Sequence, residues 1–86
     1  MDQSITVIGL DVHKDSIVAA ILPSGTDRAS QVVSLENHPA ALRRFTQRLG
    51  NQGPRVFVYE AGPCGYVVQR ELVARRERAL KLSPPP

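Results

Sequence analysis

The chain has 86 residues, enough for one small domain and too few for two. Its hydrophobic content of 42% is ordinary for a folded protein, and with no tryptophan the core must be mainly aliphatic. The single cysteine, Cys64, excludes an internal disulfide framework and a Cys-based zinc site, and favours a reducing, cytoplasmic location. No basic signal-peptide start and no apolar run of membrane-spanning length is present, so we expect no association with membranes.

Charge is distributed unevenly along the chain. Residues 1–37 carry two Lys/Arg against five Asp/Glu, a net charge of −3, whereas residues 38–86 carry nine against three, a net charge of +6. The pI near 9.6 is mildly suggestive of a polyanionic partner. An acidic half that gathers cations and a basic half that meets phosphates would suit a metal-dependent nuclease. The arginines fit the solvated outer faces of two helices equally well.

The first part of the chain predicts an antiparallel meander. Residues 5–11 are β-branched and apolar and end in Asp11, which is typical of a buried strand. Residues 16–22 supply a second strand, closed by a turn at Pro23, and residues 30–36 a third. Links this short cannot support parallel crossovers, so the three strands should pair antiparallel.

From residue 37 onwards the hydrophobic period becomes helical. Asn37 or His38 can cap this helix and Pro39 suits its first turn, while the segment 50–54 ends it. The remaining predicted elements are a strand at 55–60 that ends in Glu60, a tight turn at 61–65, a helix from Tyr66 to about Arg76, and a short fifth strand at 79–82. The residues expected to face the core from the two helices are Ala41, Leu42, Phe45, Leu49, Val68, Leu72 and Val73.

The element order β-β-β-α-β-α-(β) predicts an α/β fold with a mixed sheet, reached by a parallel crossover from the meander to the fourth strand. We expect one domain over residues 1–82. The proline-rich tail at 83–86 should continue neither a helix nor a strand.

Asp11 and Glu60 each close an apolar strand, although they lie 49 positions apart. If the first and fourth strands are parallel neighbours, both carboxylates project from the same edge of the sheet. Two carboxylates placed side by side repel each other, so the pair makes sense as ligands of a hard cation such as Mg²⁺. Pairs of such ions catalyse phosphodiester hydrolysis and transfer. The simpler alternative is that each acid is a solvated strand end or a helix N-cap.

Basic residues and single polar residues near these acids have weaker interpretations. Lys14, Arg43 and Arg44 are candidates for contacts with nucleic-acid phosphates. His13 is close enough in sequence to approach the acidic edge, although an exposed loop histidine is the commoner case. Cys64 lies near a helix N-terminus, which can lower a thiol pKa, but no partner histidine is evident, so a turn or packing role is expected.

Two motifs carry a resemblance to a known family. Residues 9–15, Gly-Leu-Asp-Val-His-Lys-Asp, resemble the opening GxDVHK(D/E) of the DEDD transposases of insertion sequences, a RuvC-like family that includes the Piv and MooV invertases. Residues 60–66, Glu-Ala-Gly-Pro-Cys-Gly-Tyr, resemble that family's second signature, E-(A/T)-(T/G)-(G/P)-x-G-(Y/F). The resemblance covers Thr6 to about Leu82. It implies a ribonuclease-H-like fold, in which Asp11 matches the first metal-binding aspartate and Glu60 the glutamate.

The same resemblance implies a function and partners. Members catalyse DNA transposition and recombination with Mg²⁺ or Mn²⁺, bind DNA, and use a guide-type non-coding RNA. Their third and fourth acids lie in a later D-x-x-D segment, and a further domain carries a serine nucleophile; nothing after Glu77 is acidic in this chain. We therefore expect an N-terminal fragment of a truncated or frameshifted gene, with weak metal binding and no activity alone. It could pair with a second copy or with an intact transposase.

Two other classes of protein share part of these features. ATP-binding domains of the actin and Hsp70 type open with the same element order and an aspartate, but they need Gly and Ser/Thr after it to hold phosphate, where this chain has Val12-His13-Lys14. The other alternative is a non-catalytic binding module or an inert remnant. Basic helices alone do not specify nucleic-acid binding. A nucleotide-binding assay would test the ATP-binding alternative, and the downstream DNA sequence would show whether a D-x-x-D segment follows in another frame.

Overall fold

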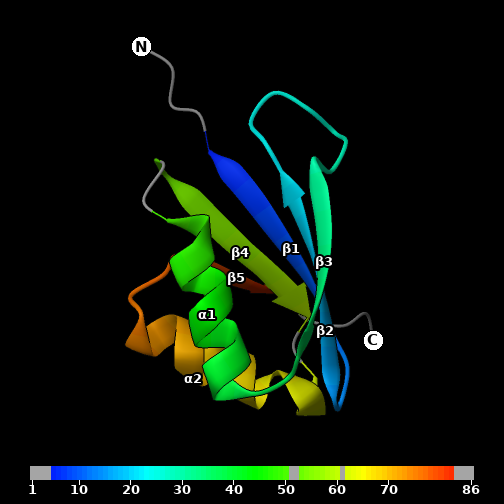
Figure 1. Ribbon diagram of the computed structural model, residues 1–86, viewed down its shortest axis with the longest axis vertical. Helices are drawn as coiled ribbons and strands as arrows, with labels where there is room; N and C mark the ends of the chain where they lie inside the picture. The colour runs from blue at the N-terminus through cyan, green and yellow to red at the C-terminus, as the bar shows by residue number, and fades with distance from the viewer. Residues whose placement is uncertain (1–4, 51–52, 61, 83–86) are drawn as a thin grey trace.

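Two layers make up the computed structural model, which describes residues 5–50, 53–60 and 62–82. A five-stranded mixed sheet forms one layer and two helices form the other (Figure 1). The elements in chain order are β1 Thr6–Val12, β2 Ser16–Leu22, β3 Gln31–Glu36, α1 Pro39–Leu49, β4 Arg55–Glu60, the 3₁₀ turn η1 Pro63–Gly65, α2 Tyr66–Ala74 and β5 Ala79–Leu82. The predicted α/β class and element order are confirmed. Neither of these described helices is long and apolar enough to cross a membrane.

The strand order in the sheet is β3-β2-β1-β4-β5. β1 pairs antiparallel with β2, and β2 with β3, as the short links between them require. α1 then carries the chain back across the sheet, so that β4 lies parallel to β1, and α2 does the same for β5 against β4 (Figure 1). The prediction that the first and fourth strands are parallel neighbours is therefore confirmed.

The hydrophobic core lies between the helices and one face of the sheet. Side chains alternate along each strand, so Ile8 and Leu10 of β1 face the helices together with Phe57 and Tyr59 of β4. Leu42, Phe45, Val68 and Leu72 complete this core from the helices. Removing a side chain of this size from water stabilises the fold by about 1.5–3 kcal/mol.

The opposite face of the sheet, called here the open face, has no helix over it in the described part of the chain. Its central row runs through residues that are paired across the strands, namely Leu80, Val58, Gly9, Ala20 and Val32. The Val32 side chain at one end of the row is 63% exposed. An added Cβ at Gly9 would meet no atom within 4 Å, so no neighbouring side chain covers the backbone in the middle of this face.

α2 differs from its prediction in two respects. It ends at Ala74, whereas the sequence predicted an end near Arg76, because Arg76 adopts a left-handed backbone with φ 57°. Val73 was expected to face the core and is 70% exposed, since only Val68 and Leu72 fall on the buried stripe. The predicted turn at 61–65 contains η1, while residue 61 and the predicted tail at 83–86 lie outside the described residues.

Candidate functional site

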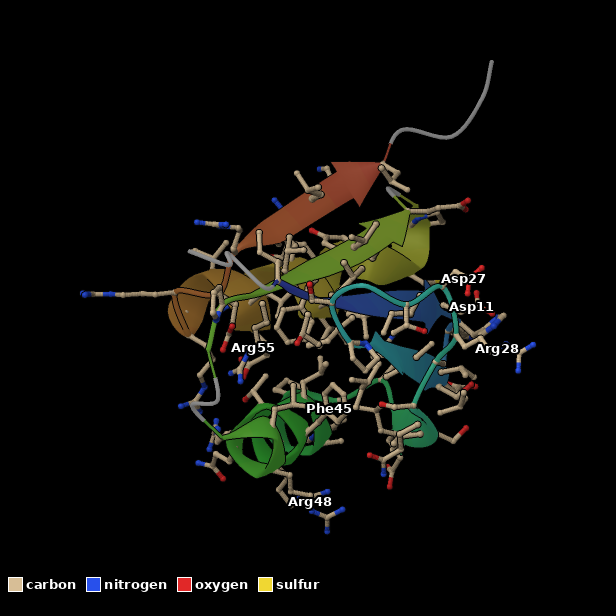
Figure 2. All side chains as sticks on the ribbon, turned by 90° about the horizontal axis from the view of Figure 1, so that it is seen from above. Asp11, Asp27, Arg28, Phe45, Arg48 and Arg55 are labelled. Carbon is tan, nitrogen blue, oxygen red and sulfur yellow. The ribbon has the colours of Figure 1, made fainter. Side chains whose placement is uncertain are left out.

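Asp11 and Glu60 occupy equivalent places in two neighbouring parallel strands. The last paired residues of β1 and β4 are Leu10 and Tyr59, and each acid is the next residue along its strand. Since Leu10 and Tyr59 face the core, alternation directs both acids to the open face. Figure 2 shows Asp11 on the side of the sheet away from Phe45 in α1. Adjacent strands lie about 4.8 Å apart, so the two acids share one small area.

The carboxylate of Asp11 is accessible to a ligand from solvent. Its side chain is 72% exposed, and its Oδ2 atom lies 3.1 Å from Nε2 of His13, which is also exposed. An exposed pair of this kind contributes at most about 1 kcal/mol, so it orients the carboxylate without occupying it strongly. Glu60 is exposed as well. Both acids are thus free to bind a cation or to remain hydrated.

Asn37 joins the two chain segments that follow the acids. Its Nδ2 atom donates to the carbonyls of His13 at 2.8 Å, Lys14 at 3.4 Å and Cys64 at 3.2 Å. The first two carbonyls belong to the turn after β1, and the third belongs to η1 after β4. The α1 cap, for which Asn37 was one candidate, is instead His38, whose Nδ1 accepts from the amide of Ala40 at 3.1 Å. The structural role of Asn37 was missed from the sequence.

The turn after Glu60 packs closely against the end of β4. Gly65 is buried, and a Cβ added there would lie 3.6 Å from the carbonyl oxygen of Glu60 and 3.6 Å from the ring of Tyr59. Burial of Tyr59 beneath this turn raises the pKa of its hydroxyl. Cys64 is half-buried and its carbonyl accepts from Asn37, so it takes part in the turn.

The basic residues predicted to contact nucleic acid do not lie on one surface. Lys14 is exposed in the turn after β1, at the same edge as the acids. Arg43 and Arg44 are exposed on α1, in the layer that covers the other face of the sheet. Arg44 lines a groove between α1 and β3. Only Lys14 is therefore placed to act together with Asp11 and Glu60.

A mostly buried ion pair lies at the other end of β4 from Glu60, and the sequence did not predict it. Arg55, at the start of β4, donates from Nε to Glu77 Oε1 at 3.1 Å and from Nη2 to Oε2 at 2.6 Å. The same guanidinium bonds the carbonyl of Gly50 at the end of α1. This two-pronged contact fixes the amino end of β4 to the segment before β5. No local pattern could predict it, because the partners are 22 residues apart.

No group of three or more His, Cys, Asp and Glu side chains in the described residues is arranged to hold a metal ion. Asp11 and Glu60 alone supply two carboxylates, which is fewer protein ligands than a tight site for a hard cation uses. Fold and site thus define a small α/β domain with a pair of exposed acids at the carboxyl edge of its parallel strands. No known family, curated protein or solved structure matches the chain.

Proposed function

We propose that the chain is an N-terminal part of a ribonuclease-H-like catalytic domain from a DEDD transposase, with Asp11 and Glu60 as its first two metal ligands. The observation that carries this proposal is the position of the two acids at the ends of adjacent parallel strands, on the same open face. Each of the two motifs that resemble the family contains one of these acids. The element order β-β-β-α-β-α-β is also the one that the resemblance implies.

The residues at this edge would divide the work as follows. Asp11 and Glu60 would hold Mg²⁺ or Mn²⁺, because two neighbouring carboxylates favour a hard divalent cation between them. Such ions, when bound, activate a water nucleophile and stabilise charge on a phosphodiester. His13 orients Asp11, Asn37 fixes the segments after both strands, and Lys14 would contact a DNA phosphate. Guide-type RNA would be a partner of the complete enzyme, not of this edge alone.

Metal titration tests the assignment of the acids. Because only two carboxylates are offered, we expect Mg²⁺ or Mn²⁺ to bind no more tightly than about 1 mM, measured by chemical-shift changes at the ends of β1 and β4. Asp11→Asn should abolish those changes. Asp15→Asn is the matched control, since Asp15 is an exposed acid in the adjacent turn. Binding that survives Asp11→Asn and is lost in Asp15→Asn would place the cation elsewhere.

Nuclease assays test the parent activity. Two carboxylates supply two negative charges against the four positive charges of two dications, so the isolated chain should not cut supercoiled, branched or single-stranded DNA. Adding in trans a polypeptide that carries the D-x-x-D segment of a DEDD transposase should produce metal-dependent cleavage. That cleavage should disappear in Asp11→Ala and in Glu60→Ala. Failure to restore it with any such segment, while the partners are shown to associate, would count against the proposal.

A further inference from the structure

A depression with an excess of positive charge lies at the amino end of β4, where the chain passes from α2 into β5. It has a volume of about 340 Å³ and is lined by Gly53, Pro54, Arg55, Arg76, Glu77 and Arg78. The three arginines against one glutamate give these lining residues a formal net charge of +2. Arg55 pairs with Thr6 at the start of β1, whereas Asp11 lies near the carboxyl end of that strand. The basic depression and the candidate acids are therefore at opposite ends of the sheet, as Figure 2 shows for Arg55 and Asp11.

Two of the three arginines in this depression are available to a ligand. Arg55 is already engaged, because its guanidinium donates to both carboxylate oxygens of Glu77. That contact also neutralises the one acid among the lining residues. Arg76 and Arg78 are exposed, and within residues 5–50, 53–60 and 62–82 neither side chain forms a hydrogen bond or an ion pair. Two exposed guanidiniums beside a neutralised pair form a surface that attracts a ligand with several negative charges.

The backbone of Arg76 gives a second, independent indication that its side chain has a use. Its φ of 57° is a left-handed conformation, which favours glycine and destabilises residues that carry a Cβ. The Arg76 amide donates to the carbonyl of Val73 where α2 ends, and glycine would make the same hydrogen bond without strain. The helix end therefore does not account for an arginine at this position. Strained backbone of this kind clusters at sites that bind ligands.

We propose that Arg76 and Arg78 bind the phosphate backbone of a nucleic acid. A guanidinium pairs with phosphate oxygens through two parallel hydrogen bonds, and nucleic acids present closely spaced phosphates along their length. Apart from Pro54, no lining residue offers an apolar side chain that would hold a peptide or insert into a membrane surface. Binding here does not depend on the roles proposed for Asp11 and Glu60, since those acids lie at the other end of the strands.

Arg76→Gly separates binding from folding, because glycine relieves the backbone strain while the substitution removes one guanidinium. We expect this variant to be at least as stable as the parent chain in urea denaturation. Its affinity for a fluorescently labelled DNA duplex of mixed sequence, measured by anisotropy, should fall about eightfold in about 0.1 M salt. The plot of log affinity against log salt concentration should become shallower by about 0.9. Arg78→Gln should change the affinity and the slope in the same way.

Arg70→Gln is the matched control for charge, because Arg70 is an exposed arginine in the middle of α2, outside the depression. It should leave the affinity and the slope nearly unchanged. Neither Asp11→Asn nor EDTA should weaken binding, which keeps this test separate from that of the metal site. Equal losses in Arg70→Gln and Arg76→Gly would overturn the proposal, because net charge alone would then explain binding. So would equal competition by phosphatidylserine vesicles or polyglutamate and by unlabelled duplex at the same concentration of charge.

Discussion

Asn37 uses one side-chain amide to join the turn after β1 to the turn after β4. Replacing it with alanine removes these hydrogen bonds and leaves the carbonyls of His13 and Cys64 without this donor. We expect Asn37→Ala to lower the free energy of unfolding by about 1–2 kcal/mol, measured by urea denaturation. Gln47→Ala, at an exposed position of α1, is the control. Equal effects of the two substitutions would show that the Asn37 contacts contribute little.

The phenol of Tyr59 links stability to pH. Burial favours its neutral form and raises its pKa above the ordinary value of 10.0. The unfolded chain therefore ionises first, so this contribution to stability is complete below about pH 10 and is lost as pH rises through the folded-state pKa. We expect the free energy of unfolding to fall as pH rises above about 10, and to fall less in Tyr59→Phe. Tyr66→Phe, at an exposed tyrosine, should leave the profile of the parent chain unchanged.

Among the helices and strands, the end of α2 is the place where a substitution is most expected to raise the free energy of unfolding. The amide of Glu77 donates to the carbonyl of Leu72, and that of Arg76 to the carbonyl of Val73. This is the Schellman arrangement, which places Arg76 at the left-handed position that glycine usually occupies. A side chain there costs about 1 kcal/mol.

We accordingly expect Arg76→Gly to raise the free energy of unfolding by up to about 1 kcal/mol, partly offset by the greater freedom of glycine in the unfolded chain. Arg75→Gly, one position earlier with φ −89°, should destabilise instead. Urea denaturation of the two variants separates these outcomes. A gain in Arg75→Gly and a loss in Arg76→Gly would contradict the proposed cap.

The elements with strong signals at both ends were predictable from the sequence. β2 and β4 have the bounds expected from their flanking turns, at 16–22 and 55–60, and β5 forms at 79–82 as predicted. The end of α2 was not predictable, because an arginine carries no local sign of left-handed backbone. The contacts of Asn37 and the Arg55–Glu77 pair were missed for another reason. They join residues more than twenty positions apart, and only the folded sheet brings those residues together.

For the molecule as a whole, the register of the sheet explains what could be inferred about the candidate site. Each acid was recognisable as a strand end, and the parallel crossover made β1 and β4 neighbours. The sequence did not reveal that both acids lie on the open face, since that depends on which face the two helices cover. Nor did the sequence show that Lys14 lies at the edge with the acids, whereas Arg43 and Arg44 both lie in the helix layer.

The strand order also implies a sequence of events during folding. β1, β2 and β3 meet through short turns, whereas β4 joins β1 only after a loop of more than forty residues has closed, which costs entropy before any contact is made. Val18 in β2 and Val58 in β4 are half-buried valines on the same open face, so they form a matched pair of probes. We expect Val18→Ala to slow folding and Val58→Ala mainly to speed unfolding, in stopped-flow measurements. Asp11 and Glu60 would then become neighbours only after this loop has closed, later than the pairing of β1, β2 and β3.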